Sequence, residues 1–336
     1  MIKQTAMQPR MAEVGKIKIG YKGAKTKSKN NVEFQPPKKY DHFMVTTTEK
    51  GADGNFIIDA TLMDKIGSKP RELSIRLLFD DIDMNFHTEF QMYKGKKRVC
   101  YGDGETATRT FQTAGKQTIP TPEGDKQVTV KADESVPIKC DPKTCPFAQP
   151  DAKGKTLCKV SGILSCMITD TMELGGVYRF RTHSWNSVSS ILAALQFFAD
   201  NTKGILQGLP LKLKMIKKTT EEHGQIDYVT IVLDGMKMLD MRQAALTEFQ
   251  NRNLLGIEMK KIESDAIQSG FLIDTDDPKD IADEYYPDET EPLDITPKKG
   301  VSSTDITEKL EQKKKQTETP VIKAEPTPKT DDGSLF

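Results

Sequence analysis

Residues 140–147 read Cys-Asp-Pro-Lys-Thr-Cys-Pro-Phe, the most cysteine-rich turn of the chain, and the rest of the fold is predicted to form around it. Four of the five cysteines fall between positions 140 and 166, and only Cys100 lies outside this window. Structural zinc takes four Cys or His ligands, which usually arrive as close pairs on tight turns. The clustering therefore predicts a metal-stapled region.

The predicted metal ligands are Cys100, Cys140, Cys145 and Cys158. Cys100 precedes the turn sequence Tyr-Gly-Asp-Gly, which can present a thiolate to a metal, whereas Cys166 lies in an apolar run and is expected to be a small buried side chain. Cys166 or a histidine is the alternative fourth ligand. Zn²⁺ is the predicted ion, with an iron–sulfur cluster and unrelated buried thiols as the alternatives.

Charge is distributed unevenly along the 336 residues, although Lys+Arg and Asp+Glu are both 49. Residues 1–39 hold ten Lys or Arg against two Glu, and residues 274–294 hold ten Asp or Glu against one Lys. Low apolar content at both ends predicts a basic flexible arm at 1–35 and an acidic, Pro-rich disordered tail at 271–336. Between them, 36–270 is predicted to be a folded core with a Cys-rich insert at about 100–166.

Hydrophobic periodicity predicts an α+β fold with an antiparallel or mixed sheet and a few packed helices. Period-two alternation and β-branched content indicate strands at 42–48, 55–58, 71–79, 87–93, 175–184, 211–217 and 227–234. Apolar stripes with helical spacing indicate helices at 185–201, 238–249 and 254–267. No apolar run reaches the ~18 residues that a membrane span requires, so a soluble protein without membrane contact is expected.

Basic side chains alternate with apolar ones on two of these strands. Arg179 and Arg181 would share one face of the first, and Lys212 and Lys214 one face of the second. Together with Tyr21 and Lys22 of the arm, these residues (Tyr21, Lys22, Arg179, Arg181, Lys212 and Lys214) are candidate nucleic-acid contacts. Exposed lysines that keep a strand soluble are the alternative interpretation.

The last residues contain Asp331, Asp332, Leu335 and Phe336. Acidic residues that run into a terminal Phe resemble the tips of bacterial and phage single-strand DNA-binding proteins, which dock on replication and repair partners. The same pattern also occurs by chance in disordered termini.

Three segments together resemble a phage family: Cys100-Tyr-Gly-Asp-Gly with Arg109, the run Cys140…Cys145-Pro…Cys158-Lys, and Gly-Gly-Val-Tyr-Arg-Phe-Arg-Thr-His-Ser at 175–184. The chain is similar to recombination directionality factors of actinophage type, over about 15–267. The resemblance implies a bound metal at the cysteines and a non-enzymatic DNA-recombination accessory protein of a mobile element. Such factors bind a large serine integrase on DNA, redirect its coiled-coil arms and favour excision.

Two other functions are weighed against this one. A single-strand DNA-binding or recombination accessory protein would use the basic strands for DNA and the Phe336 tip for partners. A metal-dependent hydrolase would need an open metal position and a nearby base, yet His87, His183 and His223 are isolated in the sequence. No enzyme is therefore expected. An odd cysteine count and no leader-like pattern predict a reducing cytoplasm, that of a bacterial host.

Overall fold

The computed structural model describes residues 12–27, 33–151, 154–169, 171, 176–220, 224–272, 274 and 276–286. These residues form sixteen strands and six helices, so the predicted α+β class is confirmed. The strands are β1 (Ala12–Lys22), β2 (Thr26–Lys27), β3 (Glu33–Phe34), β4 (Pro37–Lys50), β5 (Phe56–Ile58), β6 (Glu72–Arg76), β7 (Phe86–Lys94), β8 (Lys97–Gly102), β9 (Thr106–Phe111), β10 (Gly115–Thr121), β11 (Gly124–Val130), β12 (Glu134–Lys139), β13 (Cys158–Ile168), β14 (Gly176–Thr182), β15 (Leu211–Thr220) and β16 (Gly224–Leu233). The helices are α1 (Ala60–Ile66), α2 (Ile82–Asn85), α3 (Trp185–Thr202), α4 (Met238–Leu255), α5 (Met259–Gln268) and α6 (Pro278–Tyr285).

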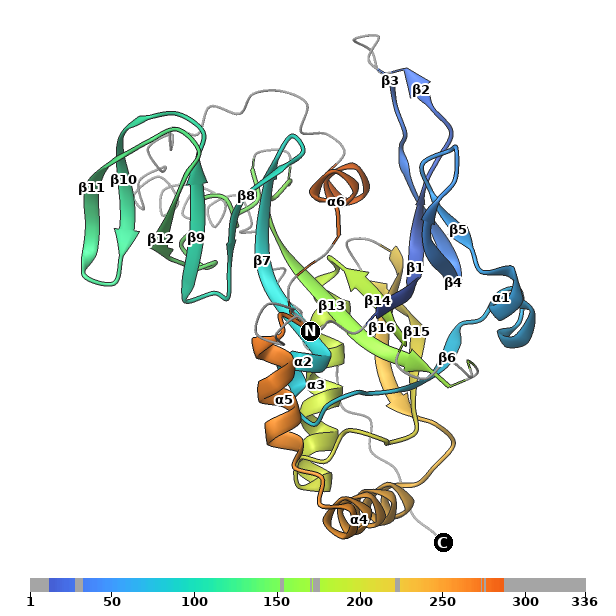
Figure 1. Cartoon of the computed structure of the whole chain (residues 1–336). Coiled ribbons are helices and arrows are strands. Elements are labelled where there is room, and N and C mark those ends of the chain that lie inside the picture. The colour runs from blue at the N-terminus through green and yellow to red at the C-terminus, as the bar shows by residue number, and fades with distance from the viewer. Residues whose placement is uncertain are drawn as a thin grey trace, which may run out of the picture. The chain divides into compact units, whose positions relative to one another are not determined.

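Twelve strands join one mixed sheet (Figure 1). Its main path runs β12-β9-β8-β7-β13-β14-β1-β4-β5, while β6 links β13 to β15, and β15 pairs with β16. Strands β1 and β14 are parallel, with Lys16 opposite Arg179 and Ile17 opposite Phe180. The described ladders on either side of this pair, β1 with β4 and β13 with β14, are antiparallel.

Strand β13 is the centre of the sheet and was missed in the sequence. It pairs with β7 along its first half, with β14 along its second half and with β6 at its end. Its middle is buried on both faces, so it shows a continuous apolar run instead of alternation. A Cβ at Gly162 would lie 2.5 Å from the Phe86 ring, so glycine is required at this crossing. The expectation that Cys166 is a buried side chain is confirmed, because it is fully buried on this strand.

Helix α3 covers the sheet and completes the main core. Ser184 caps its first turn by accepting a hydrogen bond from the Ser187 N–H at 3.5 Å, and the chain leaves the helix through Lys203 in the left-handed region at φ 56°. Its apolar stripe, including the fully buried Ile191 and Leu195, packs with the inner residues of the sheet. Among the described helices, none is long and apolar enough to cross a bilayer.

Both predicted flexible ends are partly ordered, which corrects the boundaries at 35 and 271. Strand β1 lies between β14 and β4 with Ile17 buried, so residues 12–22 of the predicted arm belong to the sheet. In the predicted tail, α6 begins after Asp277, whose side chain accepts a hydrogen bond from the Lys279 N–H. Each of these segments looked unable to fold from its composition alone, because the partners of its charges lie in the other segment. The tip residues Asp331, Asp332, Leu335 and Phe336 lie outside the described residues.

Replacing Leu164 by Ala should lower the free energy of unfolding by about 2–5 kcal/mol, because this fully buried side chain on β13 would leave a cavity in the main core. Leu239→Ala is the matched control, since that side chain is 74% exposed and the change should stay within about 0.5 kcal/mol. Urea denaturation measures both. Equal effects would contradict the central position of β13.

Candidate functional site

Cations line one face of the neighbouring strands β1 and β14. Lys16 and Lys18 lie two positions apart on β1, and Arg179 and Arg181 flank the fully buried Phe180 on β14. Because successive side chains of a strand point to opposite faces, the apolar residues enter the core and the cations share the other side. The predicted alternation of basic and apolar side chains is therefore confirmed along β14, residues 176–182.

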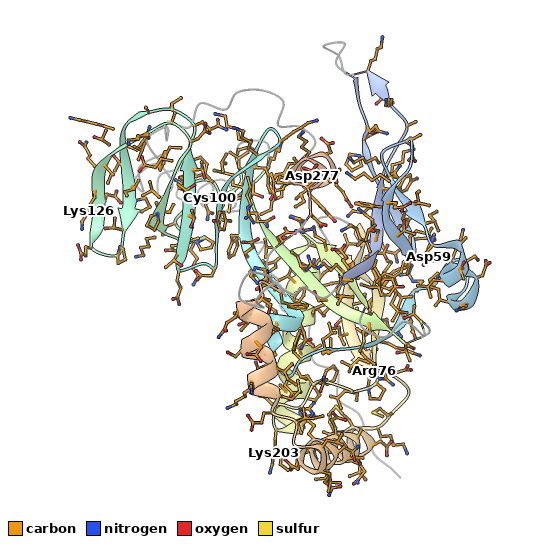
Figure 2. All side chains as sticks on the ribbon, in the orientation of Figure 1. Asp59, Arg76, Cys100, Lys126, Lys203 and Asp277 are labelled. Atoms are coloured by element: carbon orange, nitrogen blue, oxygen red, sulfur yellow. The ribbon has the colours of Figure 1, made fainter. Side chains whose placement is uncertain are left out.

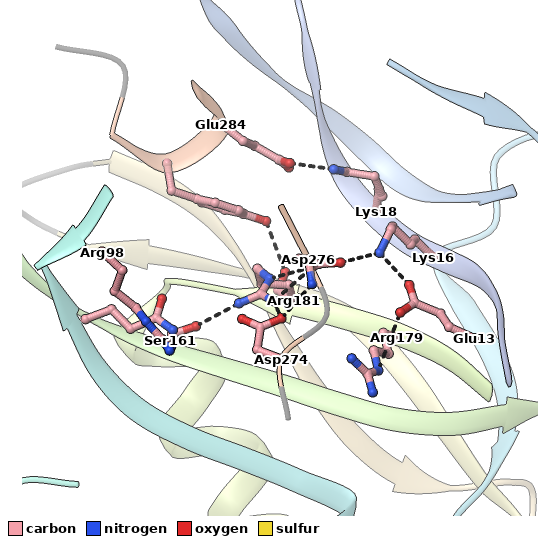
Figure 3. A network of polar contacts seen from close by, with 12 residues as sticks. Glu13, Lys16, Lys18, Arg98, Ser161, Arg179, Arg181, Asp274, Asp276 and Glu284 are labelled. Atoms are coloured by element: carbon pink, nitrogen blue, oxygen red, sulfur yellow. Dashed lines mark hydrogen bonds and ion pairs between the residues drawn. The ribbon is translucent and has the colours of Figure 1, made fainter. Parts of the chain in front are cut away.

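An acidic segment, Asp274 with residues 276–286, contacts this basic face, and we call it the acidic strap. The Arg181 guanidinium donates to Asp274 Oδ1 at 2.6 Å and to Asp276 Oδ2 at 2.8 Å (Figure 3). The Lys16 ammonium lies 2.5 Å from the other oxygen of Asp276 and also pairs with Glu13 on its own strand. Asp276 thus joins β14 and β1 through one carboxylate.

Helix α6 continues the pattern along β1 (Figure 1). Lys18 Nζ lies 2.5 Å from Glu284 Oε2, and Lys22 Nζ lies 3.5 Å from Asp280 and 3.3 Å from Asp283. Lys50 on β4 pairs with the second oxygen of Asp280. The carboxylates of this helix therefore pair with four lysines, two on β1, one on β4 and Lys96 in the turn between β7 and β8.

These groups keep their charges because they face one another. Burial acts to raise the pKa of Asp276, but the cations Arg181 and Lys16 outweigh it and hold that pKa well below its usual range. Burial likewise acts to lower the pKa of Lys16, yet Asp276 and Glu13 raise it above the ordinary lysine value. At neutral pH Asp276 and Lys16 are therefore both charged.

The C-terminal end of the strap is anchored by aromatic packing. Tyr286 is buried against Tyr93, with ring centroids 4.9 Å apart, and its hydroxyl donates to the Gln91 carbonyl at 3.0 Å. Ile281 and Ala282 of α6 join the same apolar cluster. The strap is thus held by apolar as well as ionic contacts.

His183 lies beneath the strap and is neutral. Its ring stacks on Tyr285 with centroids 4.0 Å apart, and neither ring nitrogen has a hydrogen-bond partner. Burial, together with the nearby cations Arg181 and Lys159, lowers the pKa of His183 well below the ordinary value. Lys159 also donates to the Tyr285 carbonyl at 2.7 Å.

The residues predicted to contact nucleic acid are separated by the fold. Arg179, Arg181 and Lys22 lie on the face that the strap contacts, and the ring of Tyr21 stacks on Tyr40. Lys212 pairs with Asp234 at 2.9 Å and Lys214 with Glu72 at 2.6 Å on β15, whose partners are β6 and β16. The two strands therefore do not form the single basic surface considered from the sequence.

The four cysteines predicted as metal ligands line one pocket. Cys100 lies on β8 (Figure 2), Cys140 follows β12, Cys145 closes a turn, and Cys158 begins β13. The turn forms because the Asp141 side chain accepts from the Lys143 N–H at 3.0 Å, while the Cys145 N–H donates to the Asp141 carbonyl. The predicted Gly-Asp-Gly turn joins β8 to β9. Histidines do not line this pocket, and Cys166 belongs to the main core.

The chemistry of these thiols suits zinc, whereas their present arrangement is not that of a coordination sphere. Burial, then the neighbouring Cys100, Cys145 and Cys140, raise the pKa of Cys158 to about 12. A soft cation such as Zn²⁺ would offset this repulsion between thiolates, so the donor set fits. Across the residues that the structure describes, however, no group of three or more His, Cys, Asp or Glu is placed to hold an ion.

Fold and site thus define an α+β protein with a thiol-lined pocket and a covered basic face. The family model described as Gp3-like, recombination directionality factor-like, matches residues 14–235, well over half of the chain. The protein belongs to this family, as the resemblance of the cysteine and Tyr-Arg-Phe-Arg motifs indicated. No curated protein and no solved structure matches the chain.

Replacing Asp276 by Asn should lower the free energy of unfolding by about 3 kcal/mol at pH 7, because Arg181 and Lys16 lose a buried partner. The folded pKa of Asp276 is lowered, so its contribution is fully present above the ordinary value of about 3.9 and is lost as pH falls through the folded value. The difference from wild type should therefore shrink only below about pH 4. Urea denaturation between pH 7 and pH 2 measures it, with the exposed Asp64→Asn as control. A constant difference would contradict the ion-pair assignment.

Proposed function

We propose that this protein is a recombination directionality factor that binds a serine integrase on DNA and favours recombination of prophage attachment sites, so that the element excises. Membership of the directionality factor-like family over residues 14–235 supports this function. The protein then acts in the host cytoplasm as an accessory, and the integrase supplies the catalytic groups.

Directionality in this scheme is a coupling free energy. A factor that binds one synaptic arrangement of the integrase more tightly than another shifts the populations of the two, without performing a chemical step. A tenfold preference needs only about 1.4 kcal/mol of differential contact. A modest protein surface is sufficient for this.

Helices α4 and α5 offer such a surface. Of the twelve large apolar side chains that the described residues expose, eight lie between 238 and 268: Leu239, Leu246, Phe249, Leu254, Leu255, Ile257, Ile262 and Ile267. An apolar surface of this kind on a folded domain is typical of a protein interface. Its helical form suits packing against the coiled-coil arms of an integrase.

The double substitution Leu246→Asp with Phe249→Asp should weaken binding to the serine integrase about tenfold or more. Both wild-type side chains are half-exposed, and the introduced carboxylates would have to be buried in the interface. Pull-down of integrase on attachment-site DNA in high salt measures it, alongside excision in vitro. Ile57→Asp with Ile58→Asp is the matched control, since these side chains are exposed to a similar degree, 45% and 47%. Equal binding by all three proteins would contradict this docking face.

We also propose that Cys100, Cys140, Cys145 and Cys158 hold a structural Zn²⁺ as thiolates. Their gathering around one pocket from four separate segments supports this. Bound zinc would replace the mutual repulsion of the thiolates by four attractive contacts and tie β8, β12 and β13 together.

Purified protein should contain about one zinc ion per chain, and Cys140→Ser with Cys145→Ser should abolish it and lower the melting temperature. Elemental analysis and a thermal melt measure these outcomes. Cys166→Ala, in the main core, should keep the zinc. Wild-type protein prepared without chelators and free of metal would contradict the proposal, and iron in place of zinc would indicate a cluster.

A further inference from the structure

The acidic strap covers a surface that carries the features of a nucleic-acid site. The strap contacts seven cations, which come from β1, β4, β14, the start of β13 and the turn between β7 and β8: Lys16, Lys18, Lys22, Lys50, Lys96, Lys159 and Arg181. The strap itself contains six Asp or Glu and one Lys. One chain segment therefore supplies a run of anions to a basic face, as a phosphate backbone would.

The ionic interface is incompletely packed. Two small cavities, of about 30 Å³ each, lie between the strap and the sheet. Lys18, Phe56, Asp280 and Glu284 line both of them. A space of this size can hold a water molecule, and charged side chains of both signs line it beside the Phe56 ring. The cation–carboxylate layer is thus more easily exchanged than a dry apolar core.

Aromatic rings are interleaved with the cations on the same face. Phe56 has the ammonium groups of Lys16 and Lys18 5.1 Å from its ring centroid and that of Lys50 at 5.7 Å. Tyr21 and Tyr40 stack on each other with centroids 4.4 Å apart and line the adjacent cavity. A basic groove with aromatic platforms is the usual arrangement for single-stranded nucleic acid, whose bases are free to stack.

The spacing of the cations suits a phosphate backbone. Lys16 and Lys18 are two residues apart on β1, which places them about 6.6 Å apart along the strand. Lysines that repeat along one strand face in this way can contact separate phosphates of one extended nucleic-acid strand. The face is covered by a single segment of polypeptide, so its width suits a single DNA strand better than a duplex.

We propose that the acidic strap is an intramolecular competitor that closes a single-stranded DNA-binding face on β1, β4 and β14. The inference goes beyond the proposed function and rests on it only in placing the protein at DNA. Release of the strap exposes Lys18, Lys22 and Lys50, and phosphates take the positions of its carboxylates. Because the strap is tethered, its high local concentration keeps the face closed until DNA outcompetes it.

The experiment uses the full chain with Asp280→Asn, Asp283→Asn and Glu284→Gln, which neutralise α6 without changing its shape. Anisotropy of a labelled oligodeoxythymidylate of about 30 nucleotides, longer than the ~4–16 that one site covers, measures binding. The substituted protein should bind about tenfold more tightly than wild type at low salt, with log affinity falling steeply as log salt rises. A duplex of the same length should show a smaller gain.

Two variants separate this mechanism from a general change of charge. Asp64→Asn with Asp125→Asn and Asp265→Asn alters net charge equally at exposed positions away from the strap, and it should leave binding unchanged. Adding Lys18→Ala, Lys22→Ala and Lys50→Ala to the neutralised strap should return affinity to the wild-type level or below.

Any of four results would overturn the proposal: no gain on single strands, an equal gain in the charge-matched control, a gain confined to duplex, or loss of the folded circular dichroism signal on neutralising α6. The last result would show that the strap is a structural part of the fold. Integrase pull-down with the same proteins is the independent measurement. Failure there while DNA binding opens as expected would refute the directionality role and leave the strap mechanism standing.

Discussion

The ion-pair network of Arg181, Asp276 and Lys16 is the interaction on which the arrangement of the sheet's charged face depends. These groups are largely buried, and isolated charges in such a place would cost several kcal/mol each. Pairing offsets that cost. Because each charged group is stable only beside its partner, the pairs fix the relative positions of the segments that carry them. As a result, a strand near the start of the chain and a segment 260 positions later are held together.

The network also divides the surface of the protein into two kinds of face. The basic side of β1 and β14 is occupied by the chain's own acidic strap, whereas the helices α4 and α5 keep apolar side chains exposed. The proposed protein-docking face is therefore exposed, whereas the proposed DNA-binding face is covered by the strap. For the proposed directionality role, this order would suppress non-specific attraction to DNA while partner recognition stays available.

The thiol-lined pocket lies in a part of the sheet that has only a small apolar core. Strands β8, β9 and β12 extend the sheet beyond the main core and share only a small apolar cluster, in which Cys100, Cys140 and Cys158 take part. A small cluster buries little apolar surface, and such regions commonly need a covalent or metal cross-link for stability. The proposed zinc would supply such a cross-link within this cluster.

Local pattern by itself determined much of this protein. Helix α3, strands β14 and β15 with their buried faces, and the burial of Cys166 all followed from short-range spacing, because side-chain direction repeats every two or 3.6 residues. Strand β13 was not predicted, because burial on both faces removes the alternation of apolar and polar residues that marks a strand. Only the tertiary structure decided that the predicted arm and tail are a strand and a strap. A segment rich in one sign of charge looks disordered when its composition is read alone. The two segments are stable here because the fold brings their opposite charges within 3 Å of each other.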